Sequence, residues 1–237
     1  MGYRYCSALI MIALFLPVTT AWAERDAQSQ IRVWQDERVA PGAVTVSDVT
    51  THWTVLNSVI IVGFVANSGP DPVTDIKITA SLIGADGGDV AVVDADLRPR
   101  VLLPGTRAPW RAEVARAPFQ VGARAWAEAV PLDPSDVARL APPLYVEARA
   151  FTRERAAPYV SHLSGRIVNV GDQTVSRARV LVMLIGMDGR PVAAAEKELM
   201  VRELGPNQSG MFDLDFRLGM LPMVAWYEAA AEAVVTP

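Results

Sequence analysis

Apolar and polar residues alternate along two well-separated stretches of the chain. In residues 76–82, IKITASL, every second residue is apolar, and residues 178–184, ARVLVML, keep apolar residues at the same alternate positions. A two-residue period is that of a half-buried β-strand. An Asp-Gly pair follows each stretch, at residues 86–87 and 188–189, and this pair favours a hairpin turn. Each stretch therefore predicts a strand that leads into a hairpin.

Both stretches belong to a longer internal repeat. Residues 63–90 align with residues 165–192 at a constant offset of 102 without a gap, and 10 of the 28 pairs are identical. Each half later reaches a related pentad, AWAEA at 125–129 and AWYEA at 225–229. A period near 100 residues is too long for a solenoid repeat and fits a whole domain. The sequence therefore predicts two related domains in tandem.

Short strands between turns, without an amphipathic helix of useful length, indicate the fold class. They predict an all-β chain with two tandem immunoglobulin-like antiparallel β-sandwich domains after a signal peptide. The expected parts are a signal peptide at 1–23, an N-terminal arm at 24–43, a first sandwich at 44–133, a proline-rich linker at 134–143 and a second sandwich at 144–237.

A G-x-[VI]-x-N-x-G motif opens each aligned segment. Its fixed residues are Gly63, Asn67 and Gly69 in the first copy, and Gly165, Asn169 and Gly171 in the second. Mid-strand glycine permits close backbone approach or a bulge, and Asn-x-Gly ends a strand where both residues tolerate the left-handed conformation. We interpret the motif as part of the scaffold. Trp126 and Trp226 in the two pentads are interpreted as core or sheet-edge anchors.

This pattern resembles the FxLYD-type domain, an immunoglobulin-like module of secreted bacterial proteins. That family shows G-x-[VI]-x-N-x-[GT], then an alternating strand that ends in a Leu-Tyr-Asp-like stretch before Asp-Gly, then Leu-x-Pro-Gly and an aromatic residue. Residues 82–87, LIGADG, and 184–189, LIGMDG, stand in that place, with Ile-Gly instead of Tyr-Asp in both copies. The resemblance covers most of each repeat. It implies a sandwich fold and a binding or structural role, with no catalytic residues.

The first 23 residues have the pattern of a secretory signal peptide. Arg4 precedes an apolar run over residues 8–18, and Ala21-Trp22-Ala23 provides small residues for cleavage before Glu24. The alternative is an uncleaved membrane anchor, but the run is shorter than a bilayer span and Pro17 interrupts it. We therefore expect a periplasmic or secreted protein with no transmembrane span after cleavage.

Composition and motifs narrow the function classes. The only cysteine, Cys6, lies in the leader, so the mature chain has no disulfide and no cysteine-based metal site. Cleavage removes one arginine and no acidic residue, which changes the formal net charge from −4 to −5 and argues against a nucleic-acid partner. His52 and His162 do not correspond in the repeat, and no catalytic or nucleotide-binding motif occurs. We expect no enzymatic activity and no cofactor, and we interpret His162 as a solvated surface residue.

The outward faces of equivalent strands differ in polarity. The first copy has three outward apolar residues at positions where the second copy has His162, Ser164 and Arg166. Conversely, the second copy has two outward apolar residues at positions where the first copy has Thr79 and Ser81. The five apolar residues are Ile60, Val62, Phe64, Leu181 and Met183. A strand that is apolar on both sides needs a cover on both sides. These five residues are our candidate binding residues, to be covered either by the other domain or by a partner.

These observations predict an exported, non-enzymatic binding or scaffolding protein of the cell envelope that acts through protein–protein contacts. The alternative is a periplasmic metal or small-ligand carrier. It rests on the six methionines of the mature chain, which all fall in the second repeat and whose thioethers suit Cu(I). Methionine is also a common core and interface residue. They are Met183, Met187, Met200, Met211, Met220 and Met223.

Overall fold

The structure is a computed structural model of the whole chain. It describes residues 44–236 except residues 55, 154–159 and 218–223, so the predicted signal peptide and N-terminal arm lie outside the described residues. Everything described belongs to one compact unit of the chain, Ile31–Pro237. Across these described ranges, we find no helix with the length and apolarity that a membrane crossing requires.

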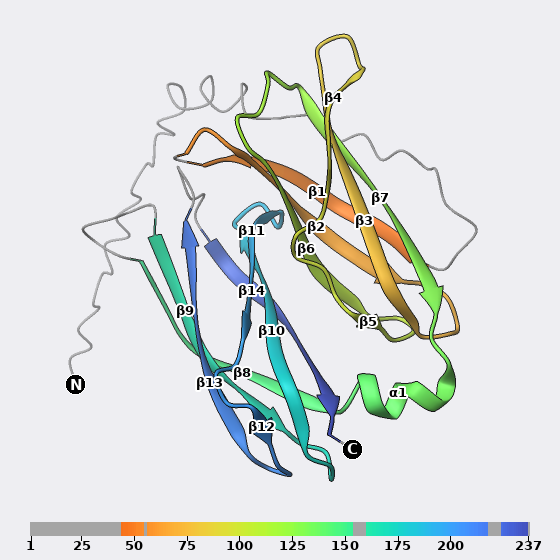
Figure 1. Cartoon of the computed structure of the whole chain (residues 1–237). Coiled ribbons are helices and arrows are strands. Elements are labelled where there is room, and N and C mark those ends of the chain that lie inside the picture. Colours follow the sequence, from red (N-terminus) through yellow and green to blue (C-terminus); the bar gives the residue numbers. More distant parts are fainter. Residues whose placement is uncertain (1–43, 55, 154–159, 218–223, 237) are drawn as a thin grey trace, which may run out of the picture. The chain divides into compact units, whose positions relative to one another are not determined.

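The first half of the described chain forms one sandwich of two antiparallel sheets (Figure 1). Its strands are β1 (Val44–Trp53), β2 (Val59–Asn67), β3 (Val73–Ile83), β4 (Asp89–Asp94), β5 (Val101–Leu102), β6 (Arg107–Val114) and β7 (Gly122–Pro131). One sheet has the order β1-β2-β6. In the other, β3 lies between β4 and β7, and the short β5 pairs with the start of β3.

The second half repeats this arrangement strand for strand. Its strands are β8 (Leu144–Arg153), β9 (Val160–Asn169), β10 (Val175–Gly186), β11 (Pro191–Glu198), β12 (Glu203–Leu204), β13 (Ser209–Arg217) and β14 (Val224–Val235). One sheet is β8-β9-β13, and in the other β10 lies between β11 and β14 with β12 beside its start. The predicted all-β fold of two tandem antiparallel sandwiches is therefore confirmed.

Between the sandwiches, the chain forms a short helix, α1 (Pro134–Leu140). The carboxylate of Asp133 accepts the backbone N–H of Ser135 at 2.8 Å and so caps the first turn, and Pro134 stands at a position where a missing N–H costs nothing. The helix therefore takes up most of the expected linker.

Both predicted hairpins are present. The pairs β3–β4 and β10–β11 are antiparallel, and their turns contain Gly87 at φ 81° and Gly189 at φ 78°. A positive φ in this region is strained for residues with a Cβ, so glycine at these positions allows the tight return.

An aromatic ring fills the centre of each sandwich against the glycine that opens the motif. Trp110 on β6 is fully buried, and a Cβ on Gly63 would lie 3.0 Å from its Nε1 and 2.8 Å from the carbonyl oxygen of Ser47. In the second sandwich, a Cβ on Gly165 would lie 2.5 Å from the ring of Phe212. The missing side chain thus lets a ring pack directly on the strand.

The motif asparagines tie the end of a strand to two neighbouring segments. Asn67 Nδ2 donates to the carbonyl oxygens of Asp71, at 2.7 Å, and Leu102, at 3.1 Å, while its Oδ1 accepts the N–H of Gly69. Asn169 makes the same three bonds in the second sandwich. None of the motif's Asn-x-Gly residues has a positive φ. The expected left-handed conformation is therefore wrong, and the side-chain bonds explain the asparagine instead.

Candidate functional site

The five candidate binding residues lie together in the contact between the two sandwiches. Ile60, Val62 and Phe64 on β2 belong to the same buried cluster as Leu181 and Met183 on β10. β11 and β14 also approach this side of the first sandwich, since they contact β2 and β6. In this structure, the two domains cover each other's apolar faces, and these side chains are not exposed to an external partner.

Polar bonds fix one end of this contact. The carbonyl oxygen of Pro191 on β11 accepts the hydroxyl of Thr50 at 2.6 Å and Nε2 of His52 at 3.1 Å, both from β1. Because a carbonyl only accepts, Nε2 carries the proton in this bond. Burial lowers the pKa of His52, and the bond to Pro191 and the charge of Asp188 oppose this only in part. His52 is therefore a neutral donor between the sandwiches at pH 7.

At the centre, an arginine joins the apolar cluster to an ion pair. The guanidinium of Arg107 on β6 lies 4.2 Å from the ring centroid of Phe64. It also donates to Glu228 on β14 through Nε at 3.1 Å and Nη2 at 2.5 Å. A cation held over a ring and paired with a carboxylate needs all three groups in place. This bridge therefore specifies how β2 and β14 meet.

The other end of the contact joins two Arg-x-Arg segments, residues 98–100 and 177–179. Arg179 Nη2 donates to the carbonyl oxygen of Arg98 at 2.8 Å, and Arg100 Nη1 donates to that of Arg177 at 3.4 Å. Glu232 accepts from Arg179 Nε at 2.9 Å and from the backbone N–H of Arg100 at 2.8 Å. Burial, and then the positive charge of Arg179, lower the pKa of Arg100. These arginines were not predicted as functional residues from the sequence, because their pairing depends on how the two sandwiches meet.

These segments line an open cleft of about 860 Å³, together with β3, the β4–β5 connection and the end of α1. Most of its basic side chains have acidic partners: Lys77 lies 3.8 Å from Asp94, Arg139 lies 2.9 Å from Asp136, and Arg179 also pairs with Glu196. Because these charges compensate one another, the cleft does not favour ligands of one sign.

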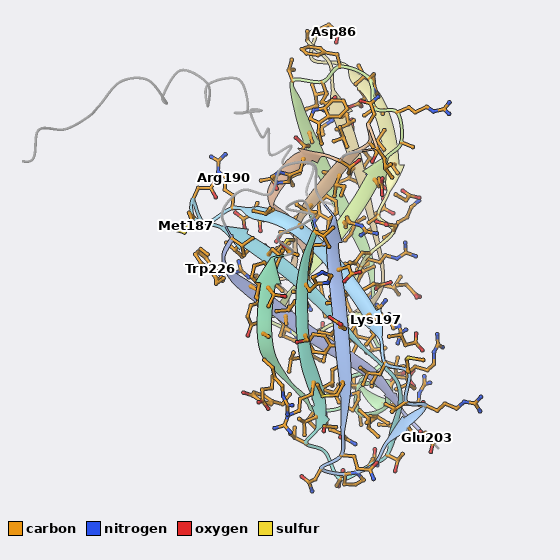
Figure 2. All side chains as sticks on the ribbon, turned by 90° about the vertical axis from the view of Figure 1, so that its left-hand side faces the viewer. Asp86, Met187, Arg190, Lys197, Glu203 and Trp226 are labelled. Carbon is orange, nitrogen blue, oxygen red and sulfur yellow. The ribbon has the colours of Figure 1, made fainter. Side chains whose placement is uncertain are left out.

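The two pentad tryptophans lie on edge strands and outside the cores. Trp126 on β7 is half-buried opposite Thr79, and Trp226 on β14 is 48% exposed. Trp226 lies over the β10–β11 turn, 4.0 Å from the Cβ position of Gly189, and Figure 2 shows it near Met187 at the same end of the second sandwich. Of the two interpretations, sheet-edge anchor describes them and core anchor is wrong.

One group of potential metal ligands occurs among the residues that the structure describes. Antiparallel pairing of β9 with β13 places His162 opposite Asp215 and Ser164 opposite Asp213. The ligand atoms of His162, Asp213 and Asp215 all lie within 4.8 Å of one another, and His162 Nδ1 is 2.7 Å from Asp215 Oδ1. His162 therefore makes a hydrogen bond to Asp215 on a sheet face and is also partly solvated. Of the methionines, Met183 is fully buried, Met187, Met200 and Met211 are exposed, and Met220 and Met223 lie outside the described residues.

No protein-family model matches the chain, and no curated protein matches it. Two solved structures illustrate its structural similarities. Red sea bream transglutaminase is 10% identical, with 83% of this chain and 31% of that chain covered at a TM-score of 0.25. The exo-chitosanase CsxA of Amycolatopsis orientalis is 12% identical, with 72% and 23% covered at a TM-score of 0.24. The chain thus spans less than a third of either protein.

Proposed function

We propose that the protein is exported and acts as a non-enzymatic binding or scaffolding component of the cell envelope, through protein–protein contacts. The observation that carries this proposal is the buried contact between the sheet that contains β2 and β6 and the sheet that contains β10, β11 and β14. It holds two sandwiches together through Phe64, Met183 and the Arg107–Glu228 pair. Two domains held in this way present their remaining sheet faces in a fixed arrangement, which is what a scaffold contributes to an assembly.

Export is supported by the sequence alone. The leader pattern over residues 1–23 and the absence of cysteine after Cys6 fit a periplasmic or secreted chain. The similarity of both repeats to FxLYD-type domains supports a binding role, because that family implies no catalytic residues.

The experiment first locates the protein and then its contacts. Cells that express the chain with its leader and a C-terminal tag are fractionated, and the intact mass is expected to show a chain that begins at Glu24. A photoreactive residue is then placed at exposed Met211 on β13 and, as a matched control, at buried Leu214 on the same strand. We expect specific envelope proteins to be crosslinked from position 211 and none from position 214. Retention in the cytoplasm, or equal crosslinking from both positions, would overturn the proposal.

A second candidate, a periplasmic metal carrier, is favoured by the group of His162, Asp213 and Asp215. These nitrogen and oxygen ligands differ from the methionine set expected from the sequence, in which Met183 is buried but Met187 and Met211 are exposed. They suit Zn²⁺ better than Cu(I). Calorimetric titration of the mature protein with each ion distinguishes the two sets: Zn²⁺ binding that His162→Gln abolishes supports this group. Cu(I) binding that only Met187→Leu abolishes supports the thioethers.

A further inference from the structure

The strand β4 and its repeat counterpart β11 have different surroundings. At the offset of 102, Val92 on β4 corresponds to Ala194 on β11, and both lie opposite an outward residue of the central strand, Ser81 and Met183 respectively. The carbonyl oxygen of Ala194 accepts Nη1 of Arg111 from the first sandwich at 3.4 Å. The first sandwich thus covers the β11 edge, whereas in the described part of the chain β4 pairs with β3 alone.

The backbone groups of Val92 point away from β3. The N–H of Ala95 donates to Ile78 on β3 at 2.8 Å, and successive residues of a strand point their backbone groups to opposite sides. Val93 and Ala91 therefore face β3, and Val92 faces outward. An outward N–H and C=O on an unpaired edge form a template for another strand.

The middle of β4 has little of the usual protection against edge pairing, because the β-bulge of this strand lies at its first residues, where Val90 is the extra residue. Val92 is 59% exposed and Val90 is 40% exposed, and no charge lies between Asp89 and Asp94 at the ends of the strand. Each of these two acids is bound across its own sheet, Asp89 by Arg124 at 2.6 Å and Asp94 by Thr79 at 2.8 Å. Their charges are thus directed along the sheet face and do not block the edge.

From this edge, we propose that two copies of the chain pair antiparallel through β4, about a two-fold axis at Val92. The occupant is a second copy because the edge is self-complementary: a two-fold axis there joins the outward N–H and C=O of each Val92 to those of the other. Asp94 of one copy, whose carboxylate is bonded to Thr79, then lies opposite Val90 of the other copy. The sheet β7-β3-β4 of one copy continues into the same sheet of the other. This proposal does not depend on export or on an envelope partner.

The test uses a single cysteine in the whole chain. In a Cys6→Ser background, Val92→Cys places two thiols on the axis, at the Cα separation of about 5.5 Å that hydrogen-bonded antiparallel pairs have and that disulfides accept. The matched control is Val130→Cys, which is 53% exposed on β7, the opposite edge of the same sheet. Mild oxidation is followed by intact mass and non-reducing electrophoresis. We expect about tenfold more covalent dimer for Val92→Cys than for Val130→Cys; equal yields overturn the proposal.

A second variant tests the backbone itself. Val92→Pro removes the outward N–H but no bond to β3, a position where edge strands accept proline. Because the contact is small, we expect the unmodified protein to dimerise in sedimentation velocity only near about 100 μM. Val92→Pro is expected to raise the dissociation constant about tenfold or more, while Val92→Thr, which keeps the N–H, has little effect. A monomeric protein at all concentrations, or a Val92→Pro dimer of unchanged affinity, overturns the proposal.

Discussion

Replacing Phe64 with arginine tests whether the contact between the sandwiches rests on the β2 face. The repeat itself offers this change, because the equivalent residue of the second sandwich is Arg166. Phe64 is buried among residues of both sandwiches, with the guanidinium of Arg107 at 4.2 Å. An arginine there places a second positive charge beside Arg107 and removes the ring.

The expected loss follows from these contacts. Burying a phenylalanine side chain contributes about 1.5–3 kcal/mol, and a cation–π contact to an arginine side chain that is 48% exposed contributes about 0.5–1 kcal/mol more. We therefore expect Phe64→Arg to lower the free energy of unfolding by about 3 kcal/mol, and the repulsion between the two neighbouring cations adds to this loss. Since the residue belongs to the interdomain cluster, the two sandwiches are also expected to unfold in separate transitions.

The assay is equilibrium urea unfolding followed by tryptophan fluorescence. The matched control is Phe119→Arg, the same chemical change at a side chain that is 77% exposed, for which we expect a change within about 0.5 kcal/mol. If Phe64→Arg unfolds in one transition with a loss no larger than that of the control, the assignment of this face to the interdomain contact is wrong.

Three further changes test other parts of the argument. Asn67→Ala leaves buried carbonyl oxygens without their donor, and we expect a loss of about 2 kcal/mol in urea unfolding; a loss below about 0.5 kcal/mol would contradict the role given to the motif. Gly63→Ala forces a Cβ against Trp110, with an expected loss of about 1–3 kcal/mol and a shifted fluorescence spectrum, whereas unchanged stability would mean that the ring can move aside. The lowered pKa of His52 means that the unfolded state binds more protons between that pKa and about 6.5, so stability should fall as the pH decreases through this range. His52→Gln, which keeps a donor for Pro191, is expected to flatten this dependence, and equal slopes for both proteins would exclude His52 as its source.

The repeat and its alternation were sufficient to predict the sandwiches, because strand periodicity and turn residues act locally. The role of Asn67 was harder to predict, since its partner Leu102 lies 35 positions away and only the folded chain brings them together. The pairing of Arg179 with Glu232 is likewise set by the register of β10 and β14. The apolar residues of β2 were recognisable because the equivalent residues of the second repeat are polar. Whether another domain or a partner covers them depends on tertiary packing, which the sequence pattern does not specify.

A comparison of equivalent residues in the two repeats also explains why the contact between the sandwiches is not expected to form between molecules. The first sandwich contributes the sheet of β2, and the second contributes the sheet of β10, so each uses a different face of one fold. Each sandwich also has the face that its counterpart uses, namely the outer face of the β3 sheet in the first sandwich and of the β9 sheet in the second. If these two faces packed together between molecules, they would join copies end to end into an open chain, as heterologous interfaces do. On those faces, polar residues stand at the positions of the buried apolar ones. Arg166, the equivalent of buried Phe64, is paired with Glu147, and Ser81, the equivalent of buried Met183, is bonded to Asp89. Packing these faces together would bury ion pairs without an apolar gain, which is unfavourable. The polar residues Arg166 and Ser81 therefore limit the contact between sandwiches to one per chain. The β4 edge is separate from these faces and is the site at which we propose that copies meet.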